Sequence, residues 1–562
     1  MQTAASEQGP RWLQLFTKRR SFPRQTENQP YIEYLEYQYD DGDEDEEDED
    51  EAGEEDEDED DTSKEHEQEK QENAEQDSNE NRNNEKGSGA SKQHSHVRRF
   101  MKGMTGDDDV LLDHEQVDEV AGYCERAGTR PSESKSSEDR KLVLVDDRHI
   151  GGAIADKKGL YRPHLGPLTS RRFMEVMSTK KRFRESSDPK AQTNAFDDEE
   201  IDAERRIMFF TDPAPSTMEA IILTTSRTQA PAVKDLLYKY LTRRTSIGVT
   251  IPPQGFLSFT LDFHIPYFAL RTSKELLKDA RTRFNGEPLR ISRTLPFLNP
   301  PISGSKPTDE IYCLYESQIS VSVTGIDHWV WIARAIVDTY FDSKESVENY
   351  HGMNGRKKGR ADPLAAGRIN ADEPIWTPRE YFFKIFEIRM QQVLKEWNRI
   401  VNKMEEDIKR SRTTHIFPLP ADDPLTRSKV RDFTQWNTHM VNLLTQLRCG
   451  LSDPIRAWEE FRRTDMGYFL EGELLTSPSP LQSSVAAVDK TFSILKLRQR
   501  KLEDLENEFD MKRSLPIQLN AYFILGNNEA ALFQQQAARH FQVLTELTIV
   551  SWFCELAFGL EI

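Results

Sequence analysis

The residues from Ile247 to Ile265 alternate between apolar and polar side chains, and this pattern constrains the fold more than any other feature of the chain. The alternating apolar positions are Ile247, Val249 and Ile251, followed by Leu257, Phe259, Leu261, Phe263 and Ile265. Successive side chains of a strand point to opposite faces of a sheet, so each run predicts a strand with one apolar face. The sequence PPQG between the runs is typical of a turn. We therefore expect an antiparallel hairpin within a β-sheet.

Further strands and helices surround this hairpin. IYCLYESQISVSVTG predicts another long strand, and KLVLVDD and RRIMFFTD predict two short ones. STMEAIILTTS and APAVKDLLYKYLTRR have the start signals of helices. HWVWIARAIVDTYF is mostly apolar around a helical circumference, so we expect a buried helix there, capped by Asp327. Strands and helices mixed in this order predict an α/β or α+β layer domain over residues 141–370.

Long helices are expected after this domain, over residues 371–475. Thr377, Pro378 and Glu380 supply an N-cap, a proline at the first helical position and a capping box. The apolar residues that then recur at helical spacing are Phe382, Phe386, Val393, Trp397, Ile400, Met404 and Ile408. This spacing predicts one long helix with a buried face.

A linker is expected at residues 476–486, followed by a stalk helix and a hydrophobic C-terminal helix over residues 487–562. The stalk carries apolar residues every seven positions, which is typical of a coiled-coil seam. These residues are Val488, Leu495, Leu502 and Phe509. Pro516 is expected to kink or break the helix, because proline removes a backbone donor and its ring clashes with the preceding turn.

Residues 1–140 are expected to be largely disordered and of low complexity. The 22 residues from Asp40 to Asp61 include 19 acidic ones, which account for most of the net charge of -22. Such a segment buries too little apolar surface to offset its conformational entropy. Four tyrosines that precede it are expected to dock on the folded body, and order is expected to return near Lys141. The rest of the chain is nearly neutral, which argues against a nucleic-acid partner.

Short motifs give no support for an enzyme or a cofactor site. Asp48 to Glu59 resembles a calcium-binding loop, but Ala52 replaces an oxygen ligand and the match arises within an acidic run. His94 and His96 lack a third ligand, and four distant cysteines form no zinc motif. Asp262 and His264 share one face of a strand, and we expect a surface or cross-strand pair there. No phosphate-binding loop, HExxH or GxSxG motif is present in the sequence.

The segment from Phe541 to Leu560 is about as long as a bilayer-spanning helix. Its ten strongly apolar residues contribute roughly -3 to -6 kcal/mol to insertion, whereas a central acidic residue such as Glu555 costs about 2.5 to 3.5 kcal/mol. Thr548, Ser551 and Glu555 fall on one narrow helical stripe. Two interpretations are open: a helix packed against protein with its stripe in water, or an assembled span whose stripe faces a pore.

The sequence EAALFQQQAARHFQVLTELTIVSWFCELAFGL resembles the region of the first transmembrane helix in fungal CorA-like proteins of the magnesium-transporter superfamily. LYKYLTRRTSIGVTIPPQGFLSFTLDFHIPYFALR, WIARAIVDTYF and PIWTPREYF resemble the body of such proteins. The resemblance is strongest over residues 205–400 and 525–560. It implies an α/β cytoplasmic domain, a long stalk helix that enters the bilayer, and a pentameric pathway for Mg²⁺ as the transported ion.

This sequence departs from the family where the first span ends. The family has Gly-Met-Asn at the pore mouth and then a second span, whereas this chain reads Gly559-Leu560-Glu561-Ile562. Gly352-Met353-Asn354 lies far from any apolar segment, so no ion-binding role is given to it. Our leading hypothesis is a truncated, degenerate CorA-like protein.

We expect this protein to be membrane-associated, with most of the chain in the cytoplasm. Its partners would be copies of itself or full-length relatives, and its role regulatory rather than that of an independent channel. Thr548, Ser551 and Glu555 are the candidate pore-facing residues. The alternative is a soluble cytoplasmic interaction protein whose acidic run binds basic partners.

Overall fold

The computed structural model describes most of the chain in separate stretches. The described residues are 10–40, 96–103, 114–125, 143–150, 160–162, 165–184, 202–253, 256–298, 310–342, 361–414, 424–470, 479–524 and 542. The chain divides into two compact units. The first comprises Met1–Asn402 and Cys449–Arg498, and the second comprises Lys403–Arg448 and Gln499–Ile562.

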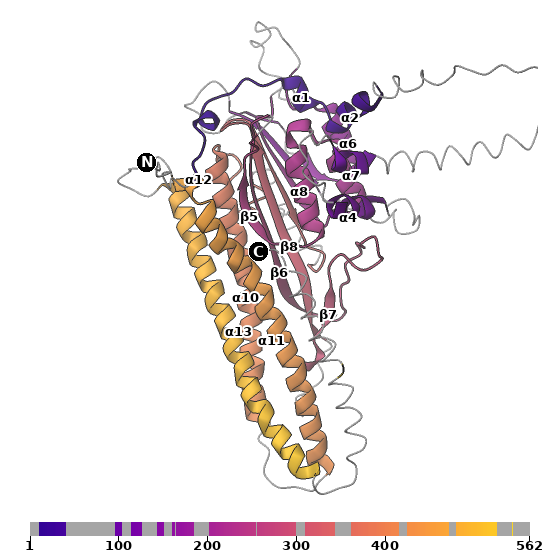
Figure 1. Ribbon diagram of the computed structural model, residues 1–562, viewed down its shortest axis with the longest axis vertical. Helices are drawn as coiled ribbons and strands as arrows, with labels where there is room; N and C mark the ends of the chain where they lie inside the picture. Colours follow the sequence, from indigo (N-terminus) through magenta and orange to yellow (C-terminus); the bar gives the residue numbers. More distant parts are fainter. Residues whose placement is uncertain are drawn as a thin grey trace, which may run out of the picture. The chain divides into compact units, whose positions relative to one another are not determined.

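A single mixed sheet forms the centre of the first unit (Figure 1). Its strands are β1 (Val143–His149), β2 (Leu160–Tyr161), β3 (Leu165–Leu168), β4 (Arg205–Thr211), β5 (Ser246–Thr250), β6 (Phe259–Ser273), β7 (Ser292–Thr294), β8 (Ile311–Gly325) and β9 (Trp331–Val337). The strand order is β2-β1-β4-β9-β8-β6-β5, and β3 and β7 pair with β1 and β8 beside this path. β4 and β9 pair in parallel, whereas the other pairs are antiparallel. The mixed α/β class predicted from the sequence is therefore confirmed.

The predicted hairpin is present as β5 and β6, and β6 continues its pairing with β8 over the full length of both strands. Because alternate side chains point to opposite faces, Leu261 and Phe263 lie on one face of β6 and Asp262 and His264 on the other. Both faces are buried along most of β6, so its polar residues lie inside the protein rather than in water.

The helix predicted after Asp327 is wrong, because residues 331–337 form strand β9 in the middle of the sheet. A strand buried on both faces carries a continuous apolar run, which periodicity alone does not distinguish from a buried helix. Asp327 accepts hydrogen bonds from the backbone N–H groups of Trp329 and Val330, at 2.8 and 2.7 Å. A helix N-cap has the same pattern, but here it closes the turn between β8 and β9.

Short helices cover one face of the sheet. They are α1 (Arg24–Asn28), α2 (Tyr31–Asp40), α4 (His114–Glu125), α6 (Ser170–Thr179), α7 (Pro215–Leu223), η5 (Arg227–Gln229) and α8 (Ala230–Leu241), with a further helical stretch at 96–102. Two more short helices are η1 (Gln14–Thr17) and η6 (Pro296–Leu298). η1 lies on the opposite face, because its Phe16 packs on Phe259, which shares a face of β6 with Phe263. The helices predicted near Ser216 and Ala230 are therefore confirmed as α7 and α8. Both have a proline in the first helical turn.

Ordered structure begins well before Lys141. Trp12 and Phe16 are buried, and each ring lies within 5.2 Å of the Phe259 ring. Tyr31 and Leu35 of α2 belong to one apolar core cluster, as does Phe100. The tyrosine-rich segment therefore docks on the body as expected, and the segment before it is packed as well.

Long helices cover the other face of the sheet within the first unit (Figure 1). The helices of this region are α10 (Pro378–Thr414), α11 (Pro424–Thr464), α12 (Gly467–Leu470) and α13 (Pro480–Ile524). α10 begins at the predicted position, where the Thr377 hydroxyl donates to the Glu380 carboxylate at 3.1 Å. The Phe386 ring stacks on Phe263 of β6 at 4.5 Å between centroids, and all the residues predicted for the buried face of α10 are buried.

The second unit consists of the remaining parts of α10, α11 and α13. Leu502 and Leu505 of α13 are buried, in agreement with the predicted seam, and Glu506 accepts from Thr445 at 2.6 Å and from Arg448 at 2.7 Å. α13 starts at Pro480, inside the range predicted as a linker. It continues through Pro516 to Ile524, so of the two predicted outcomes, a kink or a break, the break is wrong.

Among the described residues, no helix combines the length and the apolar character that crossing a bilayer requires. The predicted span from Phe541 to Leu560 lies outside the described residues except for Gln542.

Candidate functional site

The residues predicted to face a pore lie outside the described part of the chain. These residues are Thr548, Ser551 and Glu555. The calcium-like run at 48–59, His94 and the Gly352-Met353-Asn354 tripeptide also lie outside it. His96 is described, and its Nε2 lies 3.3 Å from the carboxylate of Glu36 at the surface.

Asp262 and His264 form a buried pair under α8, and not the surface pair that was one of the two predicted possibilities. Their exposed fractions are 3% and 0%. His264 Nε2 lies 3.2 Å from Asp262 Oδ2, and its Nδ1 lies 2.9 Å from the hydroxyl of Ser320 on β8. The pair thus belongs to a polar layer between the sheet and α8.

Asp235 of α8 joins Asp262 and His264 in an arrangement that has metal-ligand spacing, with ligand atoms within 4.8 Å of one another. Lys239 already supplies a positive charge here, because its Nζ lies 2.6 Å from Asp235 and 3.2 Å from Asp262. Burial alone would lower the pKa of Lys239, but the two carboxylates outweigh burial and raise it. A divalent ion in this place would have to displace the ammonium group, so we assign no metal to it.

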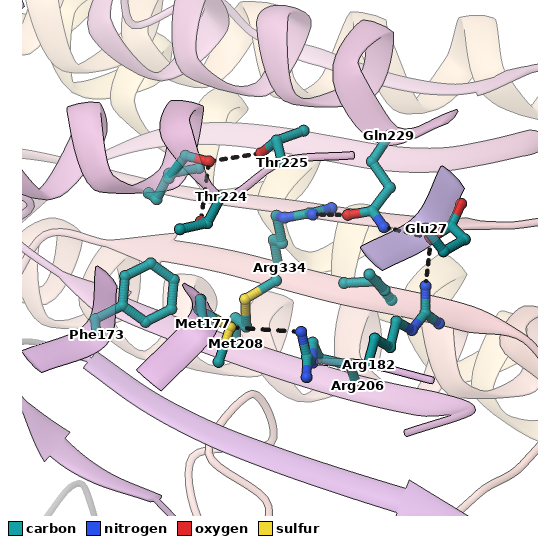
Figure 2. Close-up of a pocket in the computed structure, with 12 residues that line it drawn as sticks. Glu27, Phe173, Met177, Arg182, Arg206, Met208, Thr224, Thr225, Gln229 and Arg334 are labelled. Carbon is teal, nitrogen blue, oxygen red and sulfur yellow. Dashed lines mark hydrogen bonds and ion pairs between the residues drawn. The ribbon is translucent and has the colours of Figure 1, made fainter. Parts of the chain in front are cut away.

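A second polar cluster surrounds a small cavity between the sheet and the helices that cover it (Figure 2). Arg206 comes from β4, Arg334 from β9, and Arg182 from the segment after α6. Glu27 of α1 and Gln229 of η5 close it from the helical side. The volume of this cavity that the centre of a water molecule can occupy is about 20 Å³. All five polar side chains are buried, with exposed fractions of at most 8%.

Glu27 is the carboxylate that lines this cavity, and both of its oxygens accept hydrogen bonds. It accepts hydrogen bonds from Arg182 Nη1 at 2.9 Å and from Gln229 Nε2 at 2.8 Å, and also from the Thr228 hydroxyl. The remaining donors of Arg182 hold backbone carbonyl groups, including that of Glu204 at 2.9 Å. These bonds attach the N-terminal segment to the sheet.

Arg206 is paired with a different carboxylate, that of Asp147 on β1. Its Nε and Nη2 donate to the two oxygens of Asp147 at 2.7 and 2.8 Å, and Arg162 donates to the same carboxylate at 3.2 Å. Burial alone would raise the pKa of Asp147, but Arg206 and Arg162 outweigh burial and lower it. Asp147 therefore stays ionised and pairs with the guanidinium groups of Arg206 and Arg162.

Arg334 differs from its neighbours because no carboxylate pairs with it among the described residues. Its Nη2 donates to the side-chain oxygen of Gln229, whereas its Nε and Nη1 have no hydrogen-bond partner in the described structure. Burial, together with the charges of Arg182 and Arg206, lowers the pKa of Arg334 to about 9. The guanidinium is therefore still protonated at neutral pH.

The sequence interpretation missed this cluster. Glu27 lies in the region expected to be largely disordered, and Arg334 lies in a stretch that was predicted to be a helix. One signal was available: Arg334 interrupts the apolar run WVWIARAIV, and a charge in a buried run needs a partner from elsewhere in the chain.

Comparisons with known proteins add little to this description. No protein-family model matches the chain, and no curated protein matches it. A solved structure described as the structure of the full-length CmaX protein aligns with 64% of this chain and 76% of that chain, at 10% sequence identity and a TM-score of 0.29. A score this low does not support an inference about fold or function.

Proposed function

We propose that this protein is a membrane-associated member of the CorA-like magnesium-transporter superfamily, with its α/β body and stalk in the cytoplasm. In this proposal the segment from Phe541 to Leu560 attaches the protein to the bilayer, and the body and stalk have an assembly or regulatory role in cation transport.

The observation that carries the proposal is α13, a continuous helix of 45 residues that begins in the α/β unit and reaches Ile524. At 1.5 Å per residue this helix is about 67 Å long, far longer than the average helix of a globular protein. In the sequence it leads toward the apolar segment that starts at Phe541. An α/β domain followed by a stalk helix and an apolar helix is the order of parts that the resemblance implies.

The acidic residue in the apolar segment favours assembly over a single span. For one isolated helix, the cost of Glu555, about 2.5 to 3.5 kcal/mol, nearly cancels the apolar contribution. In an assembly the stripe of Thr548, Ser551 and Glu555 can face a shared polar interior, where intramembrane carboxylates usually lie. We therefore propose a homo-oligomer, or a mixed assembly with full-length relatives, as the membrane-bound form.

Alkaline carbonate extraction of membranes from cells that express the full chain tests the proposal. We expect the wild-type protein to stay in the membrane pellet, at least in part. Glu555→Leu removes the central charge and should increase the retained fraction. Glu561→Leu is the matched control, because it makes the same change outside the apolar segment and should leave the fraction unaltered.

Complete extraction of the wild type and of Glu555→Leu would reject the membrane proposal. It would favour the second candidate function, an interaction protein that binds basic partners. The observation behind that candidate is the acidic run from Asp40 to Asp61. Deletion of the run would then abolish binding to a polylysine resin, whereas membrane retention does not depend on it.

A further inference from the structure

The cavity beside Arg334 has an excess of positive charge. Three guanidinium groups line it, those of Arg182, Arg206 and Arg334, together with one carboxylate, that of Glu27. Asp147 adds a second carboxylate behind Arg206, but Arg162 shares it. The cavity itself therefore has three guanidinium groups and one carboxylate, while Asp147 is shared by Arg206 and Arg162, and Arg162 is also close to Asp202. An isolated buried charge is strongly unfavourable in a medium of low polarity, so this excess calls for a counter-ion.

The free donors of the cluster belong to Arg334. Its exposed fraction is 2%, and its Nε and Nη1 have no partner among the described residues. Figure 2 shows its guanidinium pointing toward Gln229, with Arg182 and Arg206 on the same cavity. Arginine presents several N–H donors in a fixed plane, which suits an anion held in that plane.

The size of the cavity restricts what can occupy it. To hold one water molecule, a cavity needs roughly 10 to 15 Å³ that the centre of the molecule can occupy. In this cavity that volume is about 20 Å³. A monatomic halide is only slightly larger than water, so it fits with small side-chain adjustments. Phosphate and larger carboxylic acids do not fit without opening the cluster. Water would satisfy the free donors but would leave the charge excess in place.

We propose that this cavity binds a small monovalent anion of the size of chloride, held by a free N–H group of Arg334, either that of Nε or that of Nη1, and by the positive charge of Arg182 and Arg206. The anion would compensate the buried charge and strengthen the attachment of Glu27 and its N-terminal segment to the sheet. This proposal is independent of the proposed membrane function, because the cavity lies within the first unit.

Thermal unfolding of the full chain in sodium chloride and in sodium gluconate, at equal ionic strength, tests the proposal. Gluconate is too large for the cavity and serves as the reference anion. Chloride and bromide should raise the Tm with a saturating dependence on concentration, by about 2 °C at ten times the Kd. Equal Tm values in chloride and gluconate at all concentrations would overturn the proposal.

Arg334→Met is the informative variant, because it removes the charge and keeps an unbranched apolar side chain. It should lose the chloride response. In gluconate it should unfold at or above the Tm of the wild type, because an uncompensated buried charge is gone. A purely structural role for Arg334 predicts the opposite, a lower Tm in both salts. Arg456→Gln changes an exposed arginine and should retain the full chloride response.

A response to chloride that persists in Arg334→Met would overturn the assignment to this cavity. If Arg334→Met does not fold, Arg334→Gln provides a second variant. It removes the charge but keeps a polar side chain that can donate to Gln229, so its Tm should no longer depend on chloride. An undiminished chloride response in Arg334→Gln would also count against the proposal.

Discussion

Replacement of Asp338 by asparagine should destabilise the α/β body more than any exposed charge change. Asp338 directly follows β9, and its exposed fraction is 1%. One oxygen accepts from Arg290 Nε at 2.7 Å and from the backbone of Gln318 at 2.9 Å. The other accepts from Arg281 at 2.9 Å and from the Tyr240 hydroxyl.

The size of the stability loss follows from the buried charge that Asp338→Asn leaves without a partner. Arg290 is fully buried, and among the described residues Asp338 is the carboxylate within ion-pair distance of it. Removal of one partner of a buried ion pair typically costs about 3 to 5 kcal/mol, because the other charge remains buried and unpaired. Asp338→Asn should therefore lower the free energy of unfolding by about this amount.

The pKa of Asp338 gives a second, smaller value for the contribution of its charge to the free energy of unfolding. Burial acts to raise this pKa, but Arg290 and Arg281 outweigh it and lower the pKa to about 2. A carboxyl group with a lowered folded-state pKa stabilises the fold above its unfolded-state pKa, near 4, and loses that effect as the pH falls toward 2. The shift corresponds to about 2.5 kcal/mol. This contribution is smaller than the loss expected for Asp338→Asn, because protonation of Asp338 keeps most of the local hydrogen bonds.

Urea unfolding followed by circular dichroism at neutral pH measures the loss. Asp453→Asn is the matched control, because it makes the same change at an exposed ion pair with Arg456 and should cost less than about 0.5 kcal/mol. The double variant Asp338→Asn, Arg290→Met should recover part of the stability. A loss for Asp338→Asn no larger than that for Asp453→Asn would refute the reasoning.

Three further predictions concern other buried side chains. Phe386→Ala should cost about 3 to 5 kcal/mol, because its fully buried ring packs on Phe263, and Phe386→Leu should cost clearly less in the same urea titration. Lys239→Met should cost about 2 kcal/mol by the same measurement, since Asp262 then lacks its ammonium partner, but Lys239 is partly exposed. Burial raises the pKa of Asp212 to about 6. Its stabilising contribution is therefore complete below about pH 4 and lost as the pH rises through 6, so the stability of Asp212→Asn relative to wild type should increase by about 3 kcal/mol over that range in a pH series of Tm values.

Much of the fold was predictable because local patterns matched their final environment. The alternation on β6 reflects a sheet whose faces differ, and the spacing on α10 reflects a helix with one buried face. β9 was not predictable in this way, because it is buried on both faces and has no period. β9 is a strand because it pairs with β4, which is distant in the sequence, and with β8, which is separated from it by a short turn.

The cavity cluster was less predictable than the fold. Its members come from α1, β4, η5, β9 and the segment after α6, and sequence spacing carries no information about their proximity. Polar residues such as Asp262 and Arg334 occupy positions where an apolar side chain would be expected. The charge of Asp262 is compensated by Lys239, which only the tertiary structure brings next to it, whereas Arg334 has no carboxylate partner among the described residues.

Flotation of the purified full-length protein with neutral phosphatidylcholine vesicles in a density gradient tests the central proposal most directly. The chain also has a basic sequence, GRKKGR, at residues 355–360, which could attract anionic lipid. Neutral lipid removes that contribution, so flotation reports on the apolar segment. The comparison is a full-length double variant, Val550→Asp with Phe553→Asp, whose added charges each oppose insertion by about 2.5 to 3.5 kcal/mol. We predict that the wild type floats with the vesicles and that the double variant stays at the bottom of the gradient. A wild-type protein that stays at the bottom with the double variant would contradict the account.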